Sequence, residues 1–364
     1  MTVKSGSIRT PGKSGPRPRK SATLRMVARE AGVSASTVSR IINGTVNVSD
    51  GLKNAVDAAI AKFDFRPNAA ARGLALGRTL TIGVVAQAID SPFYGEGLRG
   101  IEASLRHRGY APLFMSGNWA DEDEDRCIRE FIARGVDGII VFAGRLGDAK
   151  LRSYAKEVPI VVTGRRLRAQ GLFSLQIDDK HGAALAVRHL VELGHRRIAF
   201  ITGSDNHPDA LERLEGYKAA LQEAEISFDP RLIATGDWHE DGGLRATLGL
   251  LDSGVEFTAL FCVNDQTAFG AGLALFRKGL SIPRDVSLVG FDDLPSSAYR
   301  LPPLTSVRQS IGELGEQSAQ AILQLIAGQR PRIEPRPVEL VVRESTCRII
   351  RKSRAAPLQP VTAG

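Results

Sequence analysis

Two helical patterns separated by one glycine define residues 23–44, which read TLRMVAREAGVSASTVSRIING. The first pattern places four apolar residues at the spacing of one helix face: Leu24, Val27, Ala28 and Ala31. Gly32 interrupts this run. The second pattern has three inward apolar positions: Val38, Ile41 and Ile42. The segment is therefore predicted to form a helix, a tight turn and a second helix.

The second helix of this pair has a small polar face opposite its apolar one. Ser34 stands where an N-cap is wanted, and the polar face follows at helical spacing with Ser36, Ser39, Arg40 and Asn43. Such a face can enter a DNA major groove about 12 Å wide, where an arginine can donate to guanine O6 and N7. An ordinary pair of surface helices explains the same pattern about as well, because helical hairpins are common and one arginine proves little.

Two motifs resemble a known family. Residues 27–43 read VAREAGVSASTVSRIIN and are similar to the helix-turn-helix of the lactose-repressor (LacI/GalR) family of bacterial transcription regulators. Residues 65–74 read FRPNAAARGL and resemble the hinge segment of that family. Further matches run to about Glu344, so the resemblance covers nearly the whole chain.

The resemblance implies a sequence-specific DNA-binding transcriptional regulator, most often a repressor, and not an enzyme. It implies three partners: a double-stranded, pseudo-palindromic DNA operator, a small-molecule effector and a second copy of the chain. The residues after Glu344 contain no leucine heptads, which favours a homodimer over a tetramer. A bacterial cytoplasmic location, associated with the nucleoid through DNA, follows from the same resemblance, and no apolar run reaches the roughly 18 residues of a transmembrane helix.

The family pattern places the DNA contacts on the turn, the second helix and the hinge. The DNA-binding residues expected on this basis are Ser34, Ala35, Ser36, Thr37, Ser39, Arg40, Asn43, Asn68, Ala71 and Leu74. In the family the hinge folds only on the operator and presses a leucine into the minor groove, and Leu74 occupies the place of that leucine. A flexible interdomain linker is the alternative for residues 69–76. Gly73 is expected to weaken a hinge helix by about 1 kcal/mol relative to alanine.

Charge is distributed unevenly along the chain. Residues 1–78 contain 14 Lys and Arg against four acids, a net charge of +10, whereas residues 79–364 contain 34 Lys and Arg against 36 acids. Such a basic excess is typical of a phosphate-binding head. The first residues carry cations, no acid and no apolar core segment, so we interpret them as a disordered basic arm and not as a secretory signal. A transit peptide is the competing interpretation.

Neither a cofactor nor a metal is expected. The cysteines Cys127, Cys262 and Cys347 are far apart, and the six histidines form no HExxH pair. The sequence therefore indicates neither a disulfide framework nor a zinc site.

From residue 80 onward, apolar strands alternate with helices. The predicted strands include LTIGVV, YAPLFM, DGIIVF, PIVVT, RIAFIT, RLIA, FTALFCV and VSLVGF. Strands that are apolar throughout and separated by helices indicate parallel sheets covered on both faces. The units are too many for one sheet, so we expect two α/β lobes with a cleft between them. The resemblance implies the same body, similar to periplasmic binding proteins, with a chain that crosses between the lobes three times.

The predicted fold class is thus an all-α helix-turn-helix head joined to a two-lobed α/β body. The expected parts are a disordered basic arm (1–21), a helix-turn-helix DNA-binding domain (22–66), a hinge helix or linker (67–78), a two-lobed effector-binding and dimerisation domain (79–346) and a flexible tail (347–364).

Ligands of open α/β sheets bind beyond the carboxyl ends of the strands. Aromatic and polar side chains stand at those ends, and in the family the matching positions line the effector cleft: Phe93, Tyr94, Arg213, Trp238, Asn264 and Asp292. Aromatic rings that stack, with Arg, Asn and Asp to bind hydroxyls or carbonyls, suit a polar ring. A sugar or sugar acid is expected from the family, and a purine-like corepressor is the alternative.

Some of these positions have competing structural interpretations. Phe93 is also compatible with a core position, and Arg213 with an ion pair within a lobe. We expect Asp293 to be a structural cap and not a ligand. Weaker candidates for the cleft, placed there only by the resemblance, are Asp179, Asp209 and Arg165.

One motif favours an enzyme instead. Gly95, Gly97 and Gly100 fit GxGxxG, the fingerprint of NAD-dependent dinucleotide-binding enzymes. In that fingerprint the first glycine lies in the turn directly after the strand, whereas here residues 86–92 intervene and a helix is expected to have begun by Tyr94. The dehydrogenase interpretation is therefore much the weaker one.

Overall fold

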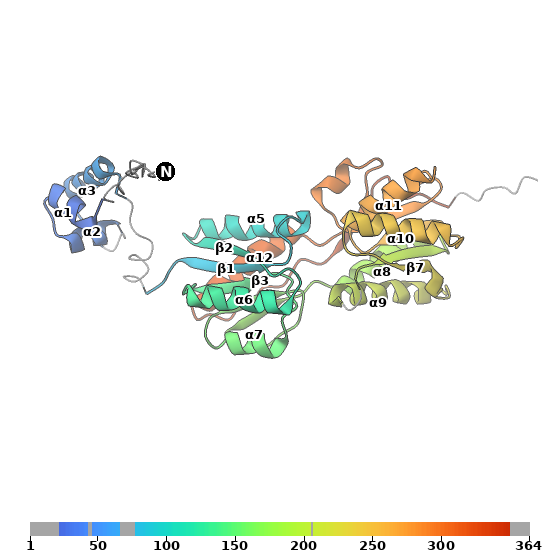
Figure 1. The fold of residues 1–364 in the computed structure, drawn as a ribbon, viewed down its shortest axis with the longest axis horizontal. Coiled ribbons are helices and arrows are strands. Elements are labelled where there is room, and N and C mark those ends of the chain that lie inside the picture. The colour runs from blue at the N-terminus through green and yellow to red at the C-terminus, as the bar shows by residue number, and fades with distance from the viewer. Residues whose placement is uncertain (1–21, 43–45, 66–76, 205–206, 350–364) are drawn as a thin grey trace, which may run out of the picture. The chain divides into compact units, whose positions relative to one another are not determined.

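The structure of the protein is a computed structural model that describes residues 22–42, 46–65, 77–204 and 207–349 (Figure 1). The chain divides into two compact units, Met1–Thr79 and Leu80–Gly364, called here the head and the body. The expected basic arm, and most of the expected hinge and tail, lie outside the described residues.

The head contains three helices: α1 (Leu24–Glu30), α2 (Ala35–Ile42) and α3 (Asp50–Phe63). Their shared core consists of Val27, Ala28, Val38, Val56, Ala59 and Phe65. Gly32 adopts a left-handed φ of 68° between α1 and α2, which glycine tolerates without steric cost. Ser34 Oγ accepts the backbone N–H of Thr37 at 3.1 Å and so begins α2 as an N-cap. The predicted helix, turn and helix are confirmed.

The first lobe of the body, called the N-lobe, contains a five-stranded parallel sheet with the order β2-β1-β3-β4-β5. Its strands are β1 (Thr81–Ala86), β2 (Ala111–Ser116), β3 (Gly138–Val141), β4 (Ile160–Thr163) and β5 (Leu172–Leu175). Helices cover both faces: α5 (Pro92–Arg106), α6 (Asp121–Ala133), α7 (Asp148–Tyr154) and the late helix α12 (Ile311–Ile326). Alternate strand residues pack toward opposite faces, so the two apolar clusters contain Ile82 and Val84 on one side and Val85 on the other.

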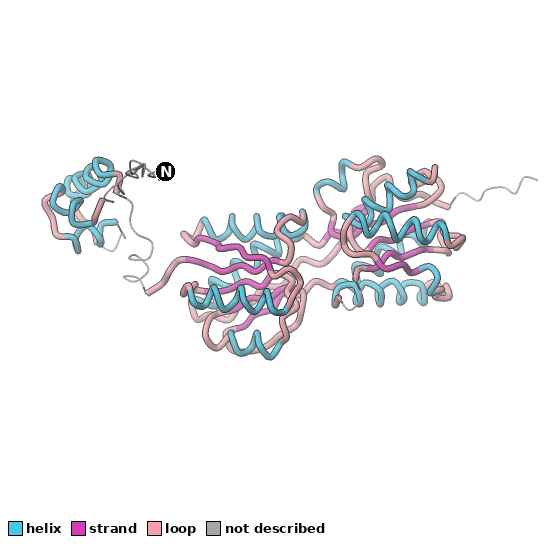
Figure 2. Tube along the Cα trace, in the orientation of Figure 1, coloured by secondary structure: helices cyan, strands magenta, loops and turns pink. Residues whose placement is uncertain are grey.

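The second lobe, called the C-lobe, has a six-stranded sheet with the order β11-β10-β9-β8-β6-β7. Its strands are β6 (Ile198–Thr202), β7 (Ile233–Thr235), β8 (Ala259–Cys262), β9 (Ser287–Asp292), β10 (Thr305–Arg308) and β11 (Glu339–Val341), the last antiparallel to β10. Its helices are α8 (Asp179–Glu192), α9 (Pro208–Glu223), α10 (Glu240–Asp252) and α11 (Asp265–Arg277), with 3-10 turns η1 (Pro230–Leu232) and η2 (Pro295–Tyr299). Figure 2 shows both sheets between layers of helices.

The chain passes between the lobes three times: from β5 to α8, from β10 to α12, and from α12 to β11. The predicted two-lobed α/β body is confirmed. Among the described residues, no helix combines the length and the apolar character needed to cross a membrane.

Close packing of two helices explains the glycine motif. All three glycines lie inside helix α5, not in a strand-to-helix turn. A Cβ at Gly100 would lie 2.0 Å from the carbonyl oxygen of Gly312 in α12, and a Cβ at Gly315 would lie 2.2 Å from the carbonyl oxygen of Gly97. A Cβ at Gly95 would meet nothing within 4 Å. Gly100 therefore lets α5 and α12 approach closely, whereas a Cβ at Gly97 would meet the Phe142 ring at 2.6 Å. Both are packing roles and not phosphate binding.

The replacement Gly100→Ala is expected to lower the free energy of unfolding of the body by about 1–3 kcal/mol, because the added methyl group forces the two helix backbones apart. Urea denaturation followed by tryptophan emission measures this loss, since both tryptophans, Trp119 and Trp238, lie in the body. Gly95→Ala is the matched control on the same helix. It has room for the methyl group and is expected to be neutral or stabilising by up to about 1 kcal/mol. Equal losses in both variants would refute the packing role.

Candidate functional site

One cavity between the lobes brings together all six cleft residues predicted from the sequence. Phe93 and Tyr94 of α5 come from the N-lobe. The C-lobe supplies the other four: Arg213, Trp238, Asn264 and Asp292. These residues stand at or after the carboxyl ends of strands in the two lobes, which places the cavity where open α/β sheets bind ligands. We call this cavity the cleft.

Arg213 is held by the C-lobe from several directions. Its Nε and Nη2 donate to Asp179 Oδ1, both at 2.7 Å, and its Nη1 donates to the Val263 carbonyl at 2.6 Å. The guanidinium also lies 3.7 Å from the centre of the Phe291 ring. Its side chain is 3% exposed, so the ion pair within the lobe that we considered as an alternative is present, and the residue nevertheless lines the cleft.

Asp292 ends strand β9 with a left-handed φ of 108°, a backbone conformation that costs a non-glycine residue of the order of 1–3 kcal/mol. Its Oδ1 lies 4.0 Å from Arg213 Nη1 and accepts from Gln309 Nε2 at 2.5 Å. Asn264 donates from Nδ2 to the Trp238 carbonyl at 2.9 Å and caps α11 by accepting the Thr267 N–H. The polar lining is thus oriented by bonds within the C-lobe.

Three buried carboxyl groups surround the single guanidinium: Asp179, Asp209 and Asp292. Burial raises the pKa of each despite the nearby Arg213, and it raises the pKa of Asp209 to about 7. Desolvation therefore outweighs the attraction of one cation shared among three acids. A further negative charge in this cluster is therefore unfavourable, and the Asp209 carboxyl group, with a pKa of about 7, titrates near neutral pH.

An aromatic row crosses the cleft from one lobe to the other. Ring centres are 6.1 Å apart for Tyr94 and Trp119, 4.7 Å for Trp119 and His207, and 4.7 Å for His207 and Trp238. Trp119 follows β2 in the N-lobe, whereas His207 precedes α9 and Trp238 follows β7 in the C-lobe. Both tryptophans of the chain therefore lie next to one imidazole.

His207 is buried and polar. Its Nδ1 accepts the Asp209 N–H at 3.2 Å, and burial lowers the pKa of the ring to about 3, so the ring is neutral and Nε2 carries the proton. Nε2 has no hydrogen-bond partner within the described residues. A buried donor without a partner is costly, so an acceptor on a bound molecule would stabilise this arrangement.

A direct hydrogen bond also joins the lobes. Ser91 Oγ of the N-lobe donates to Gln266 Oε1 of the C-lobe at 3.0 Å. The remaining cavity measures about 60 Å³, room for about two water molecules at roughly 30 Å³ each. A ring-shaped ligand therefore requires the lobes to open or the aromatic row to move.

The sequence analysis did not name seven of the described residues that line the cleft: Ala88, Ser91, Trp119, Ala143, His207, His239 and Gln266. His207 follows β6 and Gln266 follows β8, so the rule of carboxyl strand ends could have found them. Of the weaker candidates, Asp209 lines the cleft and Asp179 holds Arg213. Arg165 is not in the lining. It donates from Nη1 to the Leu146 carbonyl at 2.6 Å within the N-lobe.

Two other predicted roles have clear structural outcomes. Asp293 forms ion pairs of 2.7 Å with Arg308 and with Arg343, which is the structural role expected for it. Phe93 packs against the main apolar cluster and also lines the cleft, so both of its interpretations hold.

In the head, the predicted polar face of α2 points away from the core. Ser34, Ser36 and Arg40 are exposed, and three further predicted residues are half-buried: Ala35, Thr37 and Ser39. Val38 on the opposite face is fully buried. Four predicted DNA-binding residues lie outside the described residues: Asn43, Asn68, Ala71 and Leu74.

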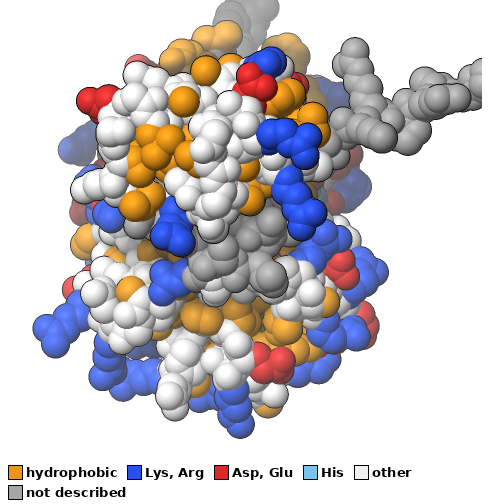
Figure 3. All heavy atoms as spheres, turned by 90° about the vertical axis from the view of Figure 1, so that its left-hand side faces the viewer, with side chains coloured by type: hydrophobic (Ala, Val, Ile, Leu, Met, Phe, Trp, Pro, Cys, Tyr) orange, Lys and Arg blue, Asp and Glu red, His pale blue; other side chains and the backbone are white. Residues whose placement is uncertain are grey.

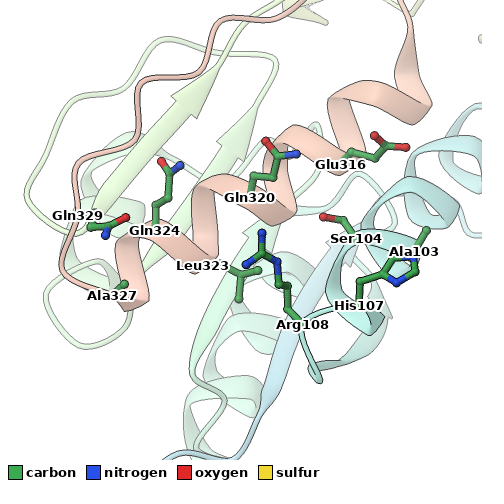
Figure 4. A pocket seen from close by; sticks show the side chains of 10 residues that line it. All are labelled: Ala103, Ser104, His107, Arg108, Glu316, Gln320, Leu323, Gln324, Ala327 and Gln329. Atoms are coloured by element: carbon green, nitrogen blue, oxygen red, sulfur yellow. The ribbon is translucent and has the colours of Figure 1, made fainter.

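A second hollow of about 780 Å³ lies between α5 and α12. Figure 4 shows Arg108, in the turn after α5, and Gln320 of α12 among its polar lining side chains. No aromatic ring other than His107 lines it, which makes it a poor match for a stacked ring. In the described part of the chain, no group of three His, Cys, Asp or Glu residues is placed to hold a metal ion.

Comparisons with known proteins agree with this architecture. The model of bacterial regulatory proteins of the lacI family matches residues 23–68, and the model of a periplasmic binding protein-like domain matches residues 187–346. The chain is 38% identical over 311 residues to the HTH-type transcriptional regulator GalR of Escherichia coli (strain K12), which is 85% of this chain and 90% of GalR. It belongs to the lacI family.

Solved structures of lacI-family proteins have the same fold. The lac repressor dimer bound to operator and the anti-inducer ONPF matches with a TM-score of 0.81 and 31% identity, covering 90% of this chain and 100% of that one. The complex of the transcriptional regulator CelR with cellobiose matches with a TM-score of 0.66 and 32% identity, covering 89% and 99%. The chain is thus a DNA-binding transcriptional regulator of the lacI family with a periplasmic-binding-protein-like body.

The raised pKa of Asp209 predicts a pH effect on the stability of this lacI-family body. Between about pH 4 and pH 7 the unfolded carboxyl is ionised while the folded one holds its proton, so the free energy of unfolding falls as pH rises through this window. Asp209→Asn removes this loss. The free energy of unfolding of the variant minus that of the unmodified protein is therefore expected to be larger at pH 8 than at pH 5. Urea denaturation of both proteins at both pH values measures this difference.

His207 titrates in the opposite sense, because its contribution is lost as pH falls from about 6.5 toward 3. It is present in both proteins, so it cancels in the difference between them. A difference that stays constant from pH 5 to pH 8 would contradict the assignment for Asp209.

Proposed function

We propose that this regulator is a homodimeric repressor whose effector is a neutral sugar bound in the cleft, with the residues of α2 reading the operator. The observation that carries the proposal is the convergence of aromatic and polar side chains from both lobes on one cavity, in a chain that also has a helix-turn-helix head. The cleft has the chemistry of a binding site, and the proposal includes no enzymatic activity. Because its target is chromosomal DNA, the protein acts in the cytoplasm.

The charges of the cleft favour a neutral ring over a sugar acid. Arg213 is already paired with Asp179, whereas Asp209 forms no hydrogen bond or ion pair through its carboxyl group within the described residues. A ligand carboxylate would add a negative charge beside Asp209 and Asp292, in a site where burial already disfavours the ionised form of both carboxyl groups. Sugar hydroxyls can instead donate to these two carboxyl groups, and Trp119 and Trp238 can stack on the apolar face of a ring. CelR, a relative of similar fold, was solved with cellobiose.

Control of DNA binding follows from the two-lobed design. The lobes are joined by three chain crossings and by contacts across the cleft, so a molecule between them changes their closure. A ligand can shift that closure only by its difference in affinity for the two states. In a dimer, a change of closure alters the spacing of the two attached heads, and half-site spacing is a geometric requirement of an operator.

Selection from randomised duplex DNA tests the regulator directly. The full-length protein at near-physiological salt is expected to enrich a pseudo-palindrome, because two copies of one head contact the two half-sites. Enrichment of single, unpaired half-sites would contradict the dimer, and no enrichment with or without sugars would contradict specific DNA reading.

Arg40→Ala is expected to weaken operator binding by about 1–3 kcal/mol and to relax specificity at one base pair, because an arginine can contact guanine with two hydrogen bonds. Binding to random duplex should change far less. Deletion of residues 4–20, which carry six cations and no acid, provides the comparison, since it removes phosphate contacts and weakens all DNA similarly. Competition titrations with operator and random duplex measure both. Equal losses on the two duplexes for Arg40→Ala would argue against base reading.

Asp292→Asn is expected to raise the Kd for the effector at least tenfold, because it removes a carboxyl oxygen that accepts from the ligand and leaves a buried donor without its partner, a cost of about 1–3 kcal/mol, while operator binding persists. Intrinsic emission provides the measurement, since the chain has two tryptophans and both contact His207 in the cleft. The probes are galactose, ribose and cellobiose, with galacturonic acid and adenine for comparison. Asp252→Asn, on the exposed surface of α10, is the matched control and should respond normally. A response to galacturonic acid alone would overturn the neutral-sugar assignment.

A further inference from the structure

A long groove lies at the outer edge of the N-lobe, away from the cleft, with a volume of about 1450 Å³. It is formed by the end of helix α7, by residues 166–174 along the edge strand β5, and by residues 325–333 at and after the end of helix α12. We call it the edge groove.

Five exposed cations line the edge groove, and no acid does: Arg152, Lys156, Arg166, Arg168 and Arg330. Within the described residues, none of the five forms an ion pair with an acid. Arg152 Nη1 donates to the Arg168 carbonyl at 2.6 Å, which fixes its guanidinium without neutralising it. Residues 145–170 contain seven Lys and Arg against two acids, whereas residues 79–364 as a whole are slightly acidic.

The edge groove opens at the amino edge of the N-lobe sheet. Helix α7 follows β3, so its last turn reaches back to that edge, and near the end of α12 Ile326 packs beside Gly138, the first residue of β3. The two helix C-termini carry partial negative charge that stabilises cations there. Strand β1 begins at the same edge, directly after the segment that joins the head to the body.

The spacing along this edge is short. Strand β5 is three strands from β1 in the sheet, a separation of about 14 Å at roughly 4.8 Å per strand. Residues 66–79, which connect the head to β1, span at most about 50 Å when extended. DNA held by the head is thus kept within reach of the amino edge. Figure 3 views the structure from the left-hand side of Figure 1 and shows Lys and Arg side chains on the visible surface.

We propose that the edge groove binds the phosphate backbone of duplex DNA next to the site held by the head, a second DNA contact made by the body itself. Duplex DNA presents one negative charge per roughly 1.7 Å of its axis, and backbone contacts are made by Lys, Arg and amide side chains. The exposed walls of the groove are of this kind, with Gln170 and Gln329 between the cations.

The chemistry of the walls favours DNA over an acidic protein. Protein interfaces are anchored by buried aromatic or large apolar side chains. The described groove residues include no exposed large apolar side chain, since Leu172 is buried and the side chains of Phe173, Leu325 and Ile333 are half-buried in the body. A groove with cations and amides but no apolar anchor is suited to bind the phosphate backbone of DNA, without preference for its sequence.

The test compares two full-length variants with equal loss of charge. In the groove variant, Arg152, Lys156, Arg168 and Arg330 are replaced by Gln. In the control variant, four exposed C-lobe cations are replaced by Gln: Arg196, Arg231, Arg277 and Arg284. The Kd for a random duplex of about 40 base pairs is measured over a range of KCl concentrations. Each lost phosphate contact lowers the salt slope by about 0.9, so the groove variant should lose about 2–4 per protomer and the control less than about 1.

A shorter duplex of about 20 base pairs separates flanking contacts from those of the head. The unmodified protein should gain affinity from the longer duplex, and the groove variant should lose that gain. The Arg40→Ala variant should keep the gain in affinity from the longer duplex. This result distinguishes a DNA contact made by the body from base contacts made by the head. Equal salt slopes for the groove and control variants would overturn the proposal. So would the absence of any DNA binding by the unmodified protein, or binding of polyglutamate by the groove with an unchanged salt slope. Unaltered urea denaturation of the groove variant shows that its fold is intact.

Discussion

The buried guanidinium of Arg213 is the contact on which the cleft depends. It joins Asp179 at the start of α8, the carbonyl of Val263 after β8 and, at longer range, Asp292 at the end of β9, so three neighbouring segments of the C-lobe converge on one cation. A buried charge is tolerated only when it is paired and hydrogen-bonded, and removal of one partner of such a pair commonly costs about 3–5 kcal/mol. The ion pair is therefore both the scaffold of the C-lobe side of the cleft and part of its polar lining, which is why a structural and a ligand-binding interpretation of Arg213 are compatible.

Closure of the cleft depends on weaker contacts than this scaffold. The row of Trp119, His207 and Trp238 and the hydrogen bond from Ser91 to Gln266 are the contacts described above that cross between the lobes at the cleft. Aromatic pairs contribute about 0.5–1.5 kcal/mol beyond their buried area, and a neutral hydrogen bond about as much. A ligand that stacks on the tryptophans and accepts from His207 Nε2 can replace these contacts at similar strength. The contacts within the C-lobe then stay intact, while contacts with the ligand replace those between the lobes. This difference allows the ligand to change the closure of the cleft.

The sequence predicted the parts of the fold whose patterns are local. The helix-turn-helix followed from helical spacing and Gly32, and the central strands of both lobes followed from apolar runs such as FTALFCV. Strands β5, β10 and β11 were not predicted, because they are only three or four residues long and each includes at least one polar side chain. The six predicted cleft residues share one cavity because the strand-end rule places them. The same rule applies to His207, but its contacts with Trp119 and Trp238 follow from no local pattern.

The glycines of helix α5 show how one local pattern can have two physical causes. In a dinucleotide site, glycines let a phosphate approach the backbone of a turn, whereas here Gly100 lets the backbone of α12 approach the backbone of α5 and Gly97 leaves room for the Phe142 ring. Both causes exclude a Cβ, so the motif alone does not distinguish them, but the position of the glycines within the helix does. The packing has a functional consequence, because α12 follows β10 of the C-lobe and is itself built into the N-lobe. A helix fixed this tightly moves as part of the N-lobe, so any change of closure must be absorbed by the short connections on either side of it.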